Sequence, residues 1–210
     1  MNIDAITVSI DYSDYLEQIV SNKDKFTRWL IVTHWSDKKT IDLCKKYSLD
    51  YMLSEEIYAD GACFAKSRAI NEAIRHLNPH DWLCVLDSDS LLPNDFNSIV
   101  ETCVNDKEAI YGCIRYTRDG VRKIENFDGA YNYPAGFFQL WHTSKFNDYY
   151  VGDMTNTEGD LQHKNRFEKS QLLPLKLVDM QKESGFKENW YGRGPIGKTR
   201  HRLYANNQSI

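Results

Sequence analysis

Two carboxylates stand two positions apart directly after a short apolar run. Trp82-Leu83-Cys84-Val85-Leu86 has the length and branching of a buried strand, and Asp87, Ser88 and Asp89 follow it at once. In an α/β fold the carboxyl ends of such strands form the edge at which ligands bind. Neighbouring carboxylates repel each other unless a cation lies beside them, and hard divalent cations prefer oxygen ligands. The pattern predicts a metal site for a diphosphate, with a helix cap or a solvated turn as the alternative.

The elements that must position these carboxylates alternate between strand and helix through the first half of the chain. Apolar branched runs predict strands, and apolar residues that recur every three or four positions predict helices. This order predicts an α/β fold with a mostly parallel, Rossmann-like central sheet and helices on both faces. We expect strands at 5–10, 29–33, 51–53 and 82–86, and helices that follow Ser13, Asp37, Ala62 and Pro93.

The second half of the chain has a less regular pattern. We expect strands at 110–116, 136–141 and 172–180, and turns at Asp119-Gly120, as a hairpin, and at Asp128-Gly129. From Gly185 onward glycine, lysine and arginine are dense and periodicity ends, which predicts a mobile C-terminal loop. Because no repeat or linker divides the 210 residues, we expect a single domain.

Composition limits the classes of partner. The formal net charge of −4 provides no basic surface, so we expect no nucleic-acid partner. No apolar stretch approaches the ~20 residues of a membrane span, and the N-terminus lacks a signal-peptide pattern. The five cysteines lack CxxC spacing, which favours free thiols in a reducing compartment. We therefore expect a cytoplasmic protein, acting in the host cytoplasm if the gene is viral.

An ordered set of segments resembles the GT-A fold glycosyltransferases, which use nucleotide-sugar donors. Residues 64–74 contain a Lys-x-x-x-x-Asn pattern, and residues 81–93 contain Asp-x-Asp followed by proline. The set continues through 110–115, 134–141 and 189–193, so it spans nearly the whole chain. The resemblance implies a nucleotide-sugar-binding half at 1–107, an acceptor half at 108–184 and a flexible C-terminal lid at 185–210.

The resemblance also implies where the donor and the metal bind. The last aspartate of the motif usually faces the metal, so Asp89 would ligate Mn²⁺ or Mg²⁺, with Asp87 on the metal or on the ribose. Many relatives carry Val-His as a further ligand after a late strand, where this chain has Val178-Asp179. Asp179 is therefore either a third ligand or the end of a strand. The other donor-site candidates are Asp11, Asp37, Lys66, Arg68, Asn71, Ser88 and Arg193.

Several donor-site candidates have a plain structural alternative. Asp37 either accepts the imino N–H of uracil or caps a helix. Lys66 and Arg68 either contact the nucleotide or belong to a solvated helix surface. Arg193 either closes over the diphosphate or lies in a frayed basic terminus.

An inverting transferase also needs a carboxylate that deprotonates the acceptor hydroxyl. The resemblance places this residue within 157–161, where Asp160 is preferred over Glu158, and also over Asp153; helix capping is the alternative. Sugar or acceptor contacts are assigned to Gly136, by close backbone approach, and to Gln139, Trp141 and Trp190. Gln139 and Trp141 serve equally well as packing residues.

The sequence thus predicts an enzyme, a metal-dependent and inverting glycosyltransferase. Its donor would be a UDP-sugar, with GDP- and dTDP-sugars open, and its acceptor a hydroxyl of a glycan or glycoconjugate. A sugar nucleotidyltransferase is one alternative, although the Gly-x-Gly-Thr-Arg motif of that class is absent near the N-terminus, as are the dinucleotide fingerprint and the P-loop. A non-catalytic module that binds nucleotide-sugars is the other.

Overall fold

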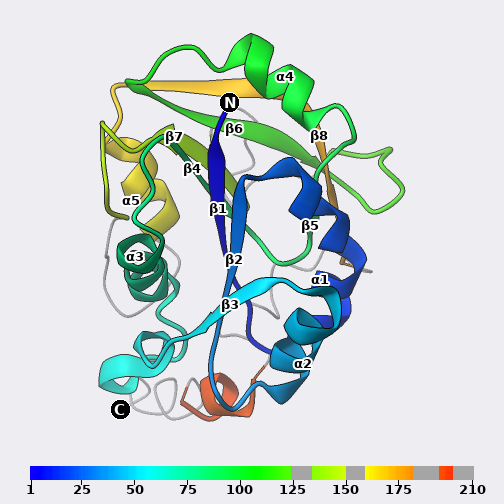
Figure 1. Cartoon of the computed structure of the whole chain (residues 1–210), viewed down its shortest axis with the longest axis vertical. Coiled ribbons are helices and arrows are strands. Elements are labelled where there is room, and N and C mark those ends of the chain that lie inside the picture. The colour runs from blue at the N-terminus through cyan, green and yellow to red at the C-terminus, as the bar shows by residue number, and fades with distance from the viewer. Residues whose placement is uncertain (124–133, 150–158, 182–193, 201–210) are drawn as a thin grey trace, which may run out of the picture.

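The computed structural model describes residues 1–123, 134–149, 159–181 and 194–200 (Figure 1). They form one eight-stranded sheet, with strands β1 (Ile3–Val8), β2 (Arg28–Thr33), β3 (Asp50–Leu53), β4 (Trp82–Leu86), β5 (Ser90–Leu91), β6 (Ala109–Tyr116), β7 (Phe138–His142) and β8 (Lys169–Asp179). The strands lie in the order β3-β2-β1-β4-β7-β6-β8-β5. The helices are α1 (Ser13–Leu16), α2 (Lys38–Tyr47), α3 (Lys66–Leu77), α4 (Phe96–Cys103) and α5 (Gly159–Asn165), with 3-10 helices η1 (Glu17–Lys25) and η2 (Glu56–Gly61).

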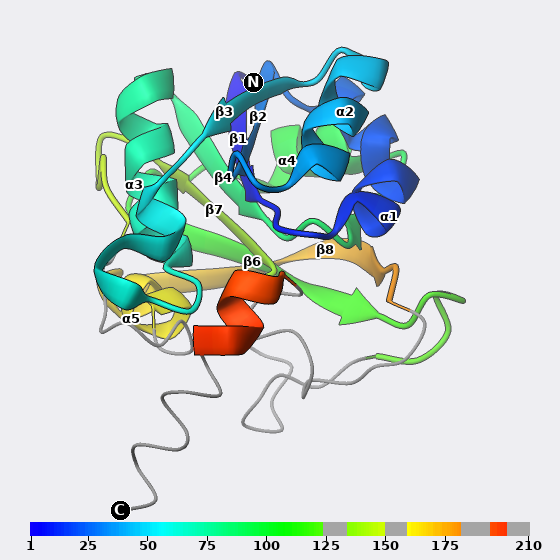
Figure 2. The ribbon, with the colours of Figure 1, turned by 90° about the horizontal axis from the view of Figure 1, so that it is seen from below.

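The first half of the sheet is parallel and covered on both faces. β2 and β4 both pair in parallel with β1, and β3 extends the sheet beyond β2. Ile6 of β1 packs in one apolar cluster with Ala69 of α3, whereas its neighbour Ala5 packs in another with Leu43 of α2. Figure 2 shows α3 on one side of the sheet and α1, α2 and α4 on the other. Burial on both faces explains why β4 is a continuous apolar run.

The second half of the sheet is mixed. β7 runs antiparallel to both β4 and β6, while β8 runs parallel to β6 and antiparallel to β5. The predicted α/β class with helices on both faces is confirmed, and four of the seven neighbouring strand pairs are parallel, three of them among β1 to β4. Parallel neighbours need long crossover connections, and the second half of the chain supplies few helices to make them.

β5 links the two halves of the sheet. It begins directly after the turn that contains Asp87 and Asp89, yet it pairs with the end of β8 rather than with β4. Asn22 of η1 anchors β5 from its other side: Nδ2 donates to Ser90 O at 2.8 Å, and Oδ1 accepts from Leu92 N at 3.0 Å. The chain therefore crosses from the centre of the sheet to β8 within this turn.

Local backbone geometry explains where the helices differ from expectation. The helix predicted from Ala62 begins only at Lys66, because Asp60 and Gly61 adopt positive φ angles of 51° and 80° and end η2. The predicted hairpin turn is confirmed, since Gly120 has a φ of 69° and its N donates to Thr117 O at 2.6 Å. The turn predicted at 128–129 lies outside the described residues.

The C-terminal segment differs from the predicted loop at residues 195–200, which are helical (red in Figure 1). Arg200 fixes this segment beside η2, because its Nη1 donates to Tyr58 O at 2.6 Å and to Ala62 O at 2.8 Å. Two further expectations concern the whole chain. The five cysteines are free thiols, as predicted. Within the described ranges no helix is long and apolar enough to cross a membrane.

Replacing Asn22 by alanine tests the anchor of β5. Asn22→Ala removes two buried hydrogen bonds to the backbone, so we expect the free energy of unfolding to fall by roughly 2–4 kcal/mol. Urea unfolding followed by fluorescence measures this change. Asn97→Ala, at an exposed position of α4, is the matched control and should change stability little. Equal stabilities for the two variants would contradict the anchoring role.

Candidate functional site

Three predicted acidic residues converge where β4, β5 and β8 meet. Asp87 follows β4, and Asp89 precedes β5. Ser90 of β5 lies opposite Asp179 of β8, and Asp89 O accepts from Met180 N at 2.8 Å. Sheet pairing therefore brings Asp179 next to Asp89, although the two are far apart in the sequence.

Asp89 is buried, and only one of its carboxylate oxygens is bonded. Gln181 Nε2 donates to Oδ2 at 2.5 Å, whereas Oδ1 has no hydrogen-bond partner among the described residues. Burial raises the pKa of the Asp89 carboxyl well above its ordinary value, and the charges of Asp87 and Asp179 act in the same direction. A positive charge beside Asp89 would relieve this strain.

Asp179 ends β8 and pairs with an arginine. Arg115 Nη1 lies 3.3 Å from Asp179 Oδ2, and Gln181 N donates to Oδ1 at 2.8 Å. Burial raises the pKa of Asp179, while Arg115 and the Gln181 N–H oppose that rise. Arg115 already neutralises part of the charge on Asp179, which makes Asp179 a weaker metal ligand than Asp89.

The chemistry of these residues suits a divalent cation such as Mg²⁺ or Mn²⁺. Such ions are commonly held by one or two carboxylates, and water and substrate phosphates complete the shell. A cage of three or more His, Cys, Asp and Glu ligands does not occur in the described part of the chain. Asp89, with its unbonded oxygen, fits the ion best, and Asp87 lies beside it.

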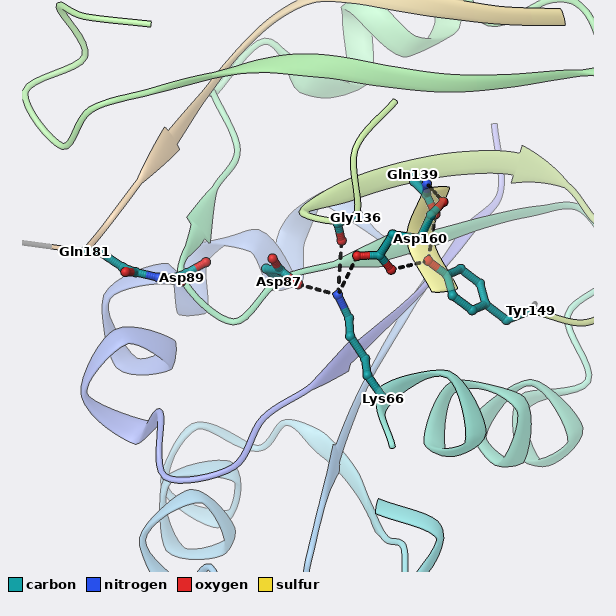
Figure 3. A network of polar contacts seen from close by, with 8 residues as sticks. All are labelled: Lys66, Asp87, Asp89, Gly136, Gln139, Tyr149, Asp160 and Gln181. Atoms are coloured by element: carbon teal, nitrogen blue, oxygen red, sulfur yellow. Dashed lines mark hydrogen bonds and ion pairs between the residues drawn. The ribbon is translucent and has the colours of Figure 1, made fainter. Parts of the chain in front are cut away.

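Lys66 lies at the start of α3 between two carboxylates (Figure 3). Its Nζ is 2.7 Å from Asp87 Oδ1, 3.2 Å from Gly136 O and 3.8 Å from Asp160 Oδ2. Burial disfavours the charge of Lys66, but Asp160 and Asp87 outweigh it and raise the pKa of the ammonium above its ordinary value. Lys66 is therefore part of the site, and the solvated-surface alternative is wrong for it.

Asp160 lies in the first turn of α5 and packs against Gly136. A Cβ atom at Gly136 would lie only 1.5 Å from Asp160 Oδ2, so this approach requires glycine. The Asp160 side chain is 29% exposed. Of the other candidate bases, Glu158 and Asp153 lie outside the described residues.

Two predicted sugar contacts lie behind Asp160 instead, where both are fully buried. Gln139 Nε2 donates to Asp160 O at 2.9 Å, and Tyr149 OH lies 2.8 Å from Gln139 Oε1. Trp141 Nε1 donates to Phe146 O at 2.9 Å, and its ring packs on Tyr149. Burial rules out a sugar contact by either side chain in this structure, so the packing alternative holds for both.

Asp37 and Asp11 lie together at the carboxyl ends of β1 and β2. Asp37 caps α2, as one alternative predicted: Oδ1 accepts from Thr40 N at 3.0 Å, and Oδ2 from Asp11 N at 2.7 Å. A contact from Asp37 to a nucleobase stays a prediction. Asp11 faces the C-terminal segment, because a Cβ at Gly194 would lie 2.6 Å from Asp11 Oδ2.

The remaining candidates are dispersed. Arg68 Nη1 lies 2.5 Å from Asp60 Oδ2 of η2. Among the described residues it forms no ion pair with Asp87, Asp89 or Asp160. Ser88 is buried in the turn between Asp87 and Asp89. The side-chain amide of Asn71 is hydrogen-bonded to the backbone of Tyr149. Arg193 and Trp190 lie outside the described residues.

Sequence reasoning missed Tyr149, Arg115 and Gln181, which contact Asp160, Asp179 and Asp89 respectively. Weak signals existed for two of them. Arg115 belongs to segment 110–115 of the resemblance, and Gln181 follows the end of a predicted strand. Tyr149 lies in an irregular stretch without periodicity, so no sequence signal marked it.

Comparison with solved structures shows a fold shared with nucleotide-sugar enzymes. Glucosyl-3-phosphoglycerate synthase from Mycobacterium tuberculosis, solved with Mn²⁺, uridine diphosphate and glucosyl-3-phosphoglycerate, matches with a TM-score of 0.56 at 10% identity, over 100% of this chain and 80% of that one. HddC from Yersinia pseudotuberculosis, complexed with GMP-PN, matches with a TM-score of 0.56 at 11% identity, over 97% and 100%.

A third match is 4-diphosphocytidyl-2C-methyl-D-erythritol synthase from Anaerococcus prevotii, with a TM-score of 0.50 at 13% identity, over 97% of this chain and 98% of that one. No protein-family model matches the sequence, and the comparison with curated proteins finds no match. At these identities the likeness establishes the fold alone. The chain has the GT-A-like, Rossmann-like fold that glycosyltransferases and nucleotidyltransferases share.

Substituting Gly136 tests the packing of Asp160. Gly136→Ala places a methyl group where the Asp160 carboxylate lies, so we expect the free energy of unfolding to fall by roughly 1–3 kcal/mol. Chemical unfolding measures the loss. The cost should shrink when Gly136→Ala is made in an Asp160→Gly background, because the clashing side chain is then gone. The same cost in both backgrounds would show that Asp160 does not pack there.

Neutralising Asp89 tests the charge strain. The raised pKa means that the folded state resists ionisation of Asp89, so the penalty is absent below pH ~4 and grows above it. We expect Asp89→Asn to raise the melting temperature in EDTA at pH 8 by several degrees, since ~1 kcal/mol corresponds to about 2–4 °C in a chain of this size. The gain should be smaller at pH 5. A lower melting temperature for Asp89→Asn at pH 8 would contradict the strain.

Proposed function

We propose that this protein is a metal-dependent glycosyltransferase that transfers a sugar from a nucleotide-sugar to a hydroxyl group. The observation that carries the proposal is the division of the site. On one side, near Asp87, Asp89 has a buried oxygen without a hydrogen-bond partner among the described residues; on the other, the Asp160 side chain is partly exposed. Lys66 bridges Asp87 and Asp160. An inverting transferase needs such a separation, because the acceptor hydroxyl attacks the anomeric carbon from the face opposite the departing diphosphate.

A divalent ion, Mn²⁺ or Mg²⁺, would be held by Asp89 with Asp87 beside it, and when bound it would stabilise the negative charge of the departing diphosphate. Lys66 adds a fixed positive charge between Asp87 and Asp160. Because that ammonium is buried and needs no rearrangement, it is suited to stabilise negative charge that develops nearby.

Asp160 accepts the proton of the acceptor hydroxyl in this proposal. The acceptor oxygen forms a bond to the anomeric carbon, and the bond from that carbon to the diphosphate breaks, with the electron pair leaving on the diphosphate. Direct displacement inverts the configuration at the anomeric carbon. Residues 1–107 would hold the donor and 108–184 the acceptor, which is a glycan or glycoconjugate.

UDP is the proposed nucleotide, following the resemblance noted in the sequence. It is supported by the solved structure of glucosyl-3-phosphoglycerate synthase, whose fold this chain shares and which holds Mn²⁺ and uridine diphosphate. The second candidate function is nucleotidyl transfer. It is supported by the likeness to 4-diphosphocytidyl-2C-methyl-D-erythritol synthase, a nucleotidyltransferase, whose TM-score of 0.50 is somewhat lower than the 0.56 of glucosyl-3-phosphoglycerate synthase.

Donor hydrolysis tests the proposal. We would incubate the purified chain with Mn²⁺ and a panel of UDP-, GDP- and dTDP-sugars, and measure the nucleoside diphosphate released. We expect slow hydrolysis of one donor that EDTA abolishes. Asp89→Ala should lower this rate at least about 100-fold, because Lewis-acid stabilisation is worth several kcal/mol.

Asp42→Ala removes an exposed carboxylate of α2 and is the matched control, with no expected effect. A parallel assay with nucleoside triphosphates and sugar phosphates detects pyrophosphate. Pyrophosphate release without nucleoside diphosphate release would establish nucleotidyl transfer instead. Nucleotide-sugar binding without any turnover would indicate a non-catalytic binding module.

A further inference from the structure

Asn71, expected in donor binding, uses both ends of its side-chain amide on Tyr149. Nδ2 donates to Tyr149 O at 2.9 Å, and Oδ1 accepts from Tyr149 N at 2.7 Å. An amide that pairs with both backbone groups of one residue fixes that residue in place, as a strand neighbour would. Asn71 thus ties the backbone at Tyr149 to α3.

The Tyr149 side chain is rigidly held. It is 1% exposed, and its ring stacks on His163 of α5, with centroids 4.2 Å apart and an interplanar angle of 21°. Trp141 packs against the same ring. Burial, reinforced by the charge of Asp160, raises the pKa of the Tyr149 hydroxyl well above its ordinary value, so the group stays a hydrogen-bond donor.

The hydroxyl of Tyr149 is directed at Asp160 (Figure 3). It lies 2.6 Å from Asp160 Oδ1, a length typical of a strong hydrogen bond to a carboxylate. Gln139 holds the backbone of the same residue through its 2.9 Å bond to Asp160 O. The other carboxylate oxygen, Oδ2, lies against Gly136 and 3.8 Å from Lys66 Nζ.

We propose that Asn71 and Tyr149 are positioning residues for Asp160: they hold one carboxylate oxygen so that the other faces the acceptor hydroxyl. The inference rests on the proposed function, in which Asp160 is the catalytic base. It reassigns Asn71 from donor binding to the geometry of the base. It also explains a buried tyrosine and a buried glutamine that the reaction does not otherwise use.

Tyr149→Phe is the primary test, because it removes only the hydroxyl and keeps the ring stacked on His163. We expect kcat for sugar transfer to fall roughly 10- to 100-fold, since misorienting a general base forfeits most of its contribution. KM for the donor and the affinity for UDP with Mn²⁺ should stay unchanged. Tyr47→Phe is the matched control, because Tyr47 OH also donates to a carboxylate, Glu17 Oε1 at 2.8 Å, but at the surface.

Asn71→Ala distinguishes positioning from donor binding. The positioning role predicts a lower kcat at unchanged donor KM, and a combined Asn71→Ala and Tyr149→Phe variant should lose little more than the worse single variant. A raised donor KM at unchanged kcat would overturn the inference and return Asn71 to the donor site.

An Asp160→Asn background separates positioning from a general loss of structure. Without the base, Tyr149→Phe has nothing left to position and should not lower the residual rate further. A structural defect would lower the rate by the same factor in both backgrounds, and that result would overturn the inference.

A crystal structure of Tyr149→Phe tests the geometry without relying on turnover. We expect the Asp160 carboxylate to leave its place against Gly136 or to occupy more than one rotamer. A carboxylate that keeps its single position would overturn the inference. If the wild-type protein releases no nucleoside diphosphate from any donor, the proposed function fails, and the crystal structure still decides whether Tyr149 positions Asp160.

Discussion

The burial of Asp89 and Asp179 close to Asp87 is the constraint on which the whole site depends. Lys66 and Arg115 supply positive charge to this edge of the sheet, but each is already engaged by its own carboxylate. The uncompensated negative charge centres on Asp89, where burial and the neighbouring acids disfavour ionisation. An apolar or amide side chain at position 89 would avoid the cost of burying a carboxylate. Residues that lower stability in this way are typical of functional sites. The acidic members of the group are Asp87, Asp89, Asp160 and Asp179.

The sheet order explains how these groups meet. β4 lies at the centre of the sheet, and β5, which follows it at once, pairs with the last strand, β8. The short connection between them therefore carries Asp87 and Asp89 across the carboxyl edge. β7 runs antiparallel to β4, so Gln139 near its start and the preceding Gly136 lie beside the carboxyl end of β4. There Gly136 O accepts from Lys66, and Gln139 donates to Asp160 O. Ligand sites at the carboxyl ends of strands are general for α/β sheets, and here the mixed second half of the sheet completes the site.

The two sides of the site are built differently. Asp89 stands on a turn anchored by Asn22, and one of its oxygens has no hydrogen-bond partner among the described residues, an arrangement suited to an exchangeable ion. The Asp160 carboxylate is bonded to buried Tyr149, and its backbone carbonyl to buried Gln139. This arrangement is suited to fixing the direction of the carboxylate. Such support from packed side chains is what keeps a reacting group within a fraction of an ångström of its working position. Lys66 contacts both sides, through Asp87 and Asp160.

Features that depend on interactions between nearby residues can be predicted from the amino-acid sequence. Apolar periodicity predicts the strands and helices of the first half. The cap at Asp37 is predictable because the side chain bonds to the helix that it precedes. The apolar run of β4 indicates that Asp87 and Asp89 follow a buried strand. Contacts between residues of different helices and strands depend on the tertiary structure. The sequence leaves both sugar contact and packing open for Gln139 and Trp141, and the structure shows that both side chains are fully buried. The sequence around Tyr149 has no periodicity, so its hydrogen bond to Asp160 is visible only in the structure. The reason is that hydrogen bonding within a helix or turn acts over a few residues, whereas burial and ion pairing between distant residues depend on the order in which strands assemble.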